Sequence, residues 1–222
     1  MDGIVKFFQD GGNLMLVNLG VFFFGLAVIV ERGVKLSQSG IREKEFTNGV
    51  EMYLRSGNLE AAAQAANKHR PAAMAQATFS LLALMKNGYE TPLLAVEESM
   101  REVRHQVNHR IGWLWTIANV ATLIGLVGTV FGLIEAFAKT ADPTIPADTK
   151  AAALSNAIAH AMNNTALGLA IAVVCIGAHG LLHNFAHKYV DATEHGLFHF
   201  VNIHAQYRKG YRPSDAPAAA KA

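Results

Sequence analysis

The chain alternates between long apolar segments without formal charge and segments that carry charges at helical spacing. Residues 11–30, 111–134 and 151–187 contain no Lys, Arg, Asp or Glu. Each of these runs is at least 20 residues long, and a helix needs about 20 residues to cross a hydrocarbon core of ~30 Å. The hydrophobic pattern therefore predicts an all-α membrane protein with three transmembrane helices and long cytoplasmic helical extensions.

The predicted topology divides the chain into membrane and aqueous segments. They are a short external N-terminus (1–10), a first transmembrane helix (11–31), a cytoplasmic helical region (32–110), a second transmembrane helix (111–138), a short external loop (139–152), a third transmembrane helix (153–180), a cytoplasmic helical extension (181–209) and a disordered tail (210–222). A cleaved signal peptide is the alternative for the first run. Asp2 and Asp10 offset Lys6 there, however, and no small-x-small cleavage site follows, which favours a membrane anchor.

The distribution of Lys and Arg predicts the orientation. Residues 32–110 carry 11 basic side chains, the segment from Lys188 carries 5, and only 3 lie elsewhere. Because cytoplasmic segments near the membrane retain positive charge, the N-terminus is expected in the periplasm and the C-terminus in the cytoplasm of a bacterial inner membrane. The basic residues behind the net charge of +2 are explained by this membrane orientation. The charge therefore gives no reason to expect a nucleic-acid partner.

The segments between the spans also have helical periodicity. Helices are expected over 42–55, 59–68 and 72–85, and Ser56-Gly57-Asn58 supplies a stop followed by an N-cap. Thr91 and Pro92 begin another helix. Since no proline follows until Pro143, this helix is expected to continue through the second span as one rod of about 70 Å. The third transmembrane helix is expected to continue toward Tyr207.

Small and hydroxyl residues interrupt the apolar pattern of the second and third spans. A membrane helix does not need such residues for solubility, but they allow another backbone to approach closely. The predicted packing or pore stripe comprises Thr122, Gly125, Gly128 and Gly132, together with Asn164 and Gly168.

Two threonines form a candidate polar site within the membrane. Thr129 and Thr165 lie about nine and about ten residues from the outer ends of their spans, so at 1.5 Å per residue they are expected at the same depth. Neither span contains a carboxylate there, and ion translocation commonly needs an ionisable relay, so a partner must supply it. The alternative is that each hydroxyl bonds the backbone carbonyl one turn back.

The run TLIGLVGTVFGLIEAF, followed about thirty residues later by NNTALGLA, resembles the TolQ/ExbB branch of the MotA/TolQ/ExbB proton-channel family. Glu31-Arg32 after the first span and Asn184 near the end of the third agree with this resemblance. It implies a homo-oligomeric ring, usually a pentamer, around a TolR/ExbD-like single-span partner. It also implies that an aspartate on the partner carries the proton and that Thr129 and Thr165 line its path.

One position departs from the family pattern. The family's I-x-E-A-L motif is replaced by Ile158-Ala159-His160-Ala161-Met162, so histidine stands where glutamate is usual. An imidazole still exchanges protons near neutral pH. Glu135 and His160 are expected at similar depth, where they would pair and gate the outer mouth; the alternative is that both lie in headgroup water and mark the span ends.

The remaining histidines suggest metal binding less strongly than an inner vestibule. His179, His183 and His187 are spaced four apart, and His195 and His199 repeat that spacing. Such a spacing places side chains on one helix face, where they would bind zinc or nickel or form a titratable collar in an oligomer. No ligand set is completed nearby, so neither a metal nor another cofactor is expected.

No arrangement typical of an enzyme occurs in the sequence, since neither a nucleophile-base-orienter set nor a phosphate loop is present. The resulting hypothesis is a ring (stator) subunit that couples proton flow to mechanical work. Outer-membrane energisation or transport, envelope maintenance and gliding motility are the processes it would power. A non-conducting membrane scaffold, in which His160 marks a lost ion path, is the alternative.

Overall fold

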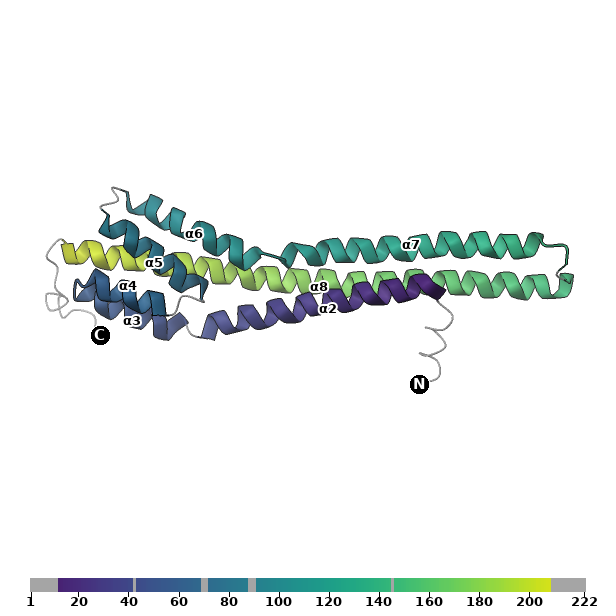
Figure 1. Ribbon diagram of the computed structural model, residues 1–222, viewed down its shortest axis with the longest axis horizontal. Helices are drawn as coiled ribbons and strands as arrows, with labels where there is room; N and C mark the ends of the chain where they lie inside the picture. The colour runs from purple at the N-terminus through teal and green to yellow at the C-terminus, as the bar shows by residue number, and fades with distance from the viewer. Residues whose placement is uncertain (1–11, 42, 69–71, 88–90, 145, 209–222) are drawn as a thin grey trace, which may run out of the picture. The chain divides into compact units, whose positions relative to one another are not determined.

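The computed structural model describes residues 12–41, 43–68, 72–87, 91–144 and 146–208. Its helices are α2 (Gly12–Ile41), α3 (Glu43–Arg55), α4 (Leu59–Lys68), α5 (Ala73–Lys86), α6 (Pro92–Asn108), α7 (Ile111–Ala141) and α8 (Ala147–Arg208), labelled in Figure 1. No strand occurs among the described residues, which confirms the all-α prediction. The predicted external N-terminus (1–10) and disordered tail (210–222) lie outside the described residues.

Three helical segments in the described part of the chain are long and apolar enough to cross a membrane. They are Leu14–Ser37, Pro92–Ala141 and Thr149–Tyr207, and their most apolar stretches of 18 residues have mean hydropathies of 2.3, 2.1 and 2.1. Each contains one of the predicted transmembrane runs, so the described residues hold three candidate spans in the expected order. The limits of each span within a bilayer stay predictions.

The helices form two compact units. The first comprises the described residues of 1–33 and 110–182, and the second those of 34–109 and 183–222. The first unit therefore contains α7 and parts of α2 and α8, whereas the second contains α3 to α6 and the remainder of α8. The boundaries between the units follow the predicted boundaries between membrane and cytoplasmic segments. The first unit is therefore expected in the lipid and the second in water.

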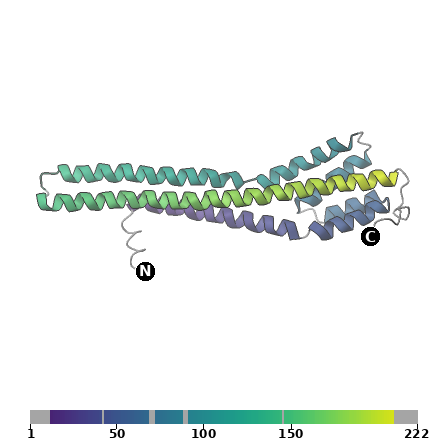
Figure 2. The same ribbon diagram turned by 180° about the vertical axis from the view of Figure 1, so that it is seen from behind.

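In the first unit, small residues bring the helices together. Figures 1 and 2 show α7 beside the first part of α8. At Gly25 of α2 an added Cβ would lie 3.1 Å from Cys175 Sγ of α8 and 3.3 Å from Ile117 Cγ2 of α7. Lipid tails are as apolar as the side chains, so close van der Waals packing rather than hydrophobic burial drives helix association in this unit.

In the second unit, large apolar side chains form the core. Leu54, Leu81, Met100, Leu197 and Phe200, which come from α3, α5, α6 and α8, are fully buried. Burying a side chain of this size contributes about 1.5–3 kcal/mol relative to leaving it in water. The predicted apolar faces of the cytoplasmic helices therefore pack into a core within one chain.

Polar contacts also join α8 to the other helices of the second unit. Met74 N–H donates to the Tyr189 hydroxyl at 3.3 Å, and Arg104 pairs with Glu194 at 3.0 Å. Gly196 lies against Met74, where a Cβ would be 2.7 Å from Cε. This end of α8 is thus held by contacts with α5 and α6.

The predicted boundaries between the shorter helices are confirmed. Helices α3, α4 and α5 match the expected ranges to within one residue. Gly57 has a φ of +75°, a conformation that glycine adopts without steric cost. Asn58 Oδ1 then accepts a hydrogen bond from Ala61 N–H at 3.0 Å, which caps α4.

The expected continuous rod from Pro92 through the second span is wrong. Helix α6 ends at Asn108 and α7 begins at Ile111. Between them Arg110 adopts a left-handed conformation, with a φ of 65°. No proline marks this break in the sequence. Arg110 forms an ion pair with another helix, since its Nη1 lies 3.1 Å from Glu31 Oε2 of α2.

The expected length of α8 is confirmed, because the helix runs without interruption for 62 residues. The segment predicted as an external loop (139–152) is mostly helical, since only residues between Ala141 and Ala147 separate α7 from α8. There Asp142 Oδ1 accepts hydrogen bonds from Thr144 N–H at 2.9 Å and from its hydroxyl at 2.6 Å. These bonds, the hydroxyl's first, hold the pKa of the Asp142 carboxyl below its usual range.

Candidate functional site

The glycines of the predicted stripe lie where α7 meets α8. A Cβ at Gly125 would lie 3.1 Å from Thr165 Cα, and one at Gly132 would lie 2.7 Å from Ala161 Cβ. On the opposite helix, a Cβ at Gly168 would lie 2.6 Å from the Ala121 carbonyl oxygen. Real Cβ atoms essentially never come within 3.0 Å of another heavy atom, so at Gly132 and Gly168 a side chain would force the helices to shift. At Gly125 the contact would be tighter than in nine of ten real cases, and such small residues allow two membrane helices to approach closely.

Asn164 fills the space that Gly128 leaves. Its side chain is 3% exposed, and a Cβ at Gly128 would overlap its Nδ2 atom. The Oδ1 atom of the same carboxamide is buried and has no hydrogen-bond partner in the protein. The polar side chain of Asn164 is therefore enclosed between two apolar helices. Its Nδ2 atom points at Gly128 of α7, where the glycine leaves space for it.

The candidate threonines have different partners. Thr165 Oγ1 donates across the helix interface to the Gly125 carbonyl at 2.8 Å. Thr129 Oγ1 donates within α7 to the Leu126 carbonyl at 2.6 Å, and Thr122 likewise to Ala118 at 3.0 Å. Local backbone bonding, the alternative considered from the sequence, thus describes Thr129 and Thr122 but not Thr165.

The two threonine hydroxyls bond neighbouring positions of α7. Thr165 Oγ1 donates to the Gly125 carbonyl and Thr129 Oγ1 donates to the Leu126 carbonyl. These carbonyls belong to consecutive residues, which differ by about 1.5 Å along a helix axis. The depth of both hydroxyls in a membrane stays a prediction.

Glu135 and His160 lie near enough to interact electrostatically, but the carboxylate pairs with another residue. Glu135 is largely exposed and pairs with Lys139 one turn along α7, at 2.7 Å. His160 is part-buried, and its Nδ1 atom is buried without a hydrogen-bond partner. The direct partner of the carboxylate is therefore a lysine rather than the imidazole, and a gating role for the two residues stays a prediction.

Asn18 of α2 belongs to the same interface and was missed in the sequence. It is fully buried, and its Nδ2 donates to the Ala121 carbonyl at 3.2 Å. The same Nδ2 atom lies 3.2 Å from the place where a Cβ of Gly168 would be. The available signal was an amide in the middle of an uncharged apolar run, which marks a functional candidate in a membrane helix.

The histidine series of α8 is divided between different contacts. His183 and His187 approach each other, with their Nε2 atoms 3.0 Å apart, while the ring of His179 lies 6.1 Å from that of Trp115. Among the described residues, no group of three or more His, Cys, Asp or Glu side chains is arranged to hold a metal ion.

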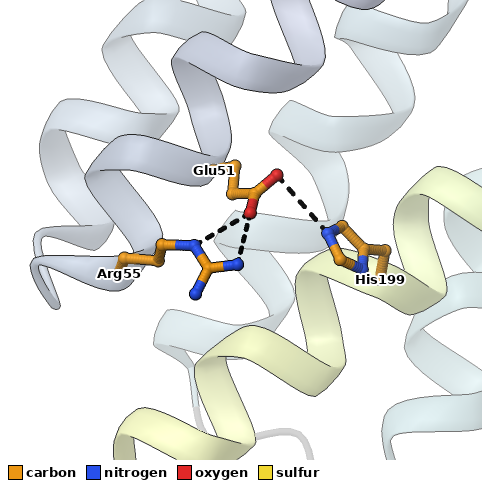
Figure 3. Close-up of polar contacts among 3 residues, drawn as sticks. All are labelled: Glu51, Arg55 and His199. Atoms are coloured by element: carbon orange, nitrogen blue, oxygen red, sulfur yellow. Dashed lines mark hydrogen bonds and ion pairs between the residues drawn. The ribbon is translucent and has the colours of Figure 1, made fainter. Parts of the chain in front are cut away.

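Farther along α8, a histidine joins an ion pair of α3. Figure 3 shows Glu51 between Arg55 and His199. Arg55 donates to Glu51 Oε1 through Nε at 2.8 Å and Nη2 at 2.5 Å, and His199 Nε2 lies 3.4 Å from Oε2. The Arg55 hydrogen bonds lower the pKa of the Glu51 carboxyl, with a smaller contribution from His199. His199 therefore contacts another helix of its own chain.

Comparison with known proteins shows which family this chain belongs to. The sequence profile of the MotA/TolQ/ExbB proton channel family matches residues 66–195, which include α6, α7 and most of α8. The chain belongs to this family. The matched region includes the glycine contacts between α7 and α8 and the bond from Thr165 to Gly125. Asn18 lies before the matched region.

Two relatives place the chain in the TolQ/ExbB branch of the family, as its resemblance predicted. The chain is 36% identical to biopolymer transport protein exbB1 of Vibrio cholerae serotype O1 over 104 residues, which are 47% of this chain and 44% of that protein. It is 27% identical to putative biopolymer transport protein ExbB-like 3 of Synechocystis sp. over 167 residues, 75% of this chain and 78% of that protein. The match thus spans less than half the length of the Vibrio protein.

Proposed function

We propose that this protein is the ring (stator) subunit of an inner-membrane motor that couples proton flow to mechanical work. The observation that carries the proposal is the cross-helix bond from Thr165 to Gly125, which lies inside the region matched by the proton-channel family. A hydroxyl held at a glycine contact between two spans places a polar group in the membrane interior. Such groups are costly there and typically mark ion pathways.

The pathway needs an acid that this chain does not supply. Residues 111–134 and 151–187 contain no Asp or Glu, and Glu135 pairs with Lys139. We therefore propose a TolR/ExbD-like single-span partner whose membrane aspartate carries the proton past Thr165 and Thr129. Several copies of this chain, five in the proposed ring, would surround that partner.

The energetics agree with repeated proton transfer. One elementary charge crossing 100 mV releases about 2.3 kcal/mol, which is too little for large mechanical work on a folded partner in one step. The names of the two relatives refer to biopolymer transport, so outer-membrane energisation is the process that we favour over envelope maintenance and gliding motility.

A flux measurement tests the proposal. The complex with its single-span partner would be reconstituted in vesicles, and proton uptake would be followed with a pH-sensitive dye under an imposed potential. We expect Thr165→Val to lower uptake by about tenfold, equivalent to about 1.4 kcal/mol in the barrier, because the valine removes the interhelical hydroxyl at nearly the same volume. Thr140→Val is the matched control, since Thr140 bonds its own helix at Ala136.

Two outcomes would contradict the proposal. Uptake that is equal in the wild type and in Thr165→Val would remove the threonine from the path. An intact, correctly assembled complex that conducts no protons would favour the scaffold, in which His160 marks a lost pathway. Co-purification with mass measurement of the membrane complex would establish the partner and the number of subunits.

A further inference from the structure

Four polar side chains follow one stripe of α7 inside the first unit. The position of each side chain along α7 is given by the residue of α7 that it, or its neighbour in the chain, contacts. Asn18 bonds the Ala121 carbonyl, Thr165 bonds the Gly125 carbonyl, Asn164 fills the space at Gly128, and His160 precedes Ala161, which lies against Gly132. Positions 121, 125, 128 and 132 share one face of a helix. The polar side chains therefore form a row along the interface of α2, α7 and α8.

The spacing of this polar row is regular. Successive contact positions on α7 differ by three or four residues, which at 1.5 Å per residue corresponds to steps of about 4.5–6 Å. From Ala121 to Gly132 the row covers about 16 Å, roughly half of a ~30 Å hydrocarbon core. Two hydrogen bonds of about 2.8 Å each, made by one bridging water, reach about the length of one step.

Three atoms of the polar row have unused hydrogen-bonding capacity. Asn18 Oδ1, Asn164 Oδ1 and His160 Nδ1 are buried and have no hydrogen-bond partner among the described residues. The side chains of Asn18 and Asn164 are 0% and 3% exposed. A buried acceptor left without a donor is unfavourable, so the two amide oxygens, one on α2 and one on α8, favour a donor from outside the chain. Water is the donor that fits between groups spaced in this way.

We propose that the polar row is a water-bridged proton path within each subunit, running from Asn18 to His160. The inference rests on the proposed function and adds α2 to the helices that carry protons. Each water passes one proton on as it receives another, and the carboxamides stay neutral while they orient the waters. The imidazole of His160 accepts a proton at the end of the path and releases one, so no net charge is left in the row.

Proton uptake by the reconstituted complex tests the role of Asn18. Asn18→Leu keeps the branching at Cγ and removes the amide, and we expect it to lower uptake by about tenfold, equivalent to about 1.4 kcal/mol in the barrier. Asn18→Ser leaves a hydroxyl and room for water, and should stay within about twofold of the wild type. Met15→Leu is the matched control, because Met15 is also fully buried on α2 and contributes no polar group.

The outcomes separate this inference from the proposed function. If the wild type conducts and Asn18→Leu conducts equally well, the path is wrong while the proton-driven motor stands. If Asn18→Leu and Met15→Leu lower uptake equally, α2 acts through packing alone and the path is again wrong. Thermal unfolding of both variants identifies a loss that comes from misfolding.

A second measurement does not depend on conduction. In a Cys175→Ala background, which removes the one native thiol, Asn18→Cys and Met15→Cys would each be exposed to silver ions, which are small enough to follow water. We expect the thiol at position 18 to react at least about tenfold faster than that at position 15, since only the former lies on the proposed path. Equal inertness of both thiols would overturn the proposal even if the complex conducts.

Discussion

The glycines of α7 and α8 differ in which atoms an added side chain would contact, although the sequence alone does not distinguish them. Gly168 faces the Ala121 carbonyl, where a Cβ would be 2.6 Å away, whereas Gly177 on the same helix has nothing within 4 Å. A backbone oxygen cannot rotate away as the end of a flexible side chain can. The energetic role of each glycine is therefore decided by the helix opposite, and one substitution can distinguish the two kinds.

Alanine at these two positions should have opposite effects on stability. Gly168→Ala is expected to destabilise the protein by about 1–3 kcal/mol, as overpacking a close contact does. Gly177→Ala should be neutral or slightly stabilising, because alanine is favoured over glycine in a helix by up to about 1 kcal/mol. Thermal unfolding in detergent measures both. A similar melting temperature for the two variants would show that α7 and α8 do not touch at Gly168.

At the scale of elements, the break between α6 and α7 shows how a contact from another helix ends a regular pattern. No proline occurs between Pro92 and Pro143 to end the helix, and Arg110 is an unusual residue for a left-handed conformation. That conformation costs about 1–2 kcal/mol for a residue with a Cβ. The half-exposed ion pair with Glu31 stabilises this conformation by at most about 1 kcal/mol. The packing of the flanking helices must therefore offset the rest of its conformational cost.

Two substitutions at this break separate its backbone strain from its charge. Arg110→Gly and Arg110→Val both remove the ion pair, but only valine keeps a β-branched side chain at a φ of 65°. We expect Arg110→Val to be less stable than Arg110→Gly by about 1 kcal/mol. The free energy of unfolding of both variants measures the difference. Equal values would mean that residue 110 is not left-handed in the folded protein.

At the scale of the whole molecule, the chain enters each unit twice. The first unit takes residues from 1–33 and 110–182, and the second from 34–109 and 183–222. The chain passes between the two units within α2, between α6 and α7, and within α8. Helices α2 and α8 each contribute residues to both units.

The orientation of the units is testable by thiol labelling in spheroplasts. In a Cys175→Ala background, Thr144→Cys lies in the exposed turn between α7 and α8, and Glu97→Cys lies on the exposed face of α6. Because most Lys and Arg residues lie in the predicted cytoplasmic segments, an impermeant reagent should label position 144 in intact spheroplasts and position 97 only after permeabilisation. The reverse pattern would place the N-terminus in the cytoplasm.

The features that were predictable from the sequence depend on local pattern. Charge-free runs predicted the three spans, and Gly57 with Asn58 predicted the boundary between α3 and α4, because chain length, side-chain polarity and glycine conformation act over a few residues. The small residues of the second span predicted close packing for the same reason. The family resemblance likewise rests on contiguous motifs, and the family match confirms it.

What the sequence determined by itself is thus the class of each segment: membrane or aqueous, helix or boundary, large or small at a contact. Only the tertiary structure decided which segments meet and in what register. It directs Thr165 to α7 while Thr129 bonds its own helix, brings the amide of Asn18 to Ala121, and ends a helix at Arg110. The physical reason is that periodicity defines a helix face, whereas the rotation and sliding of two helices depend on side chains far apart in the chain.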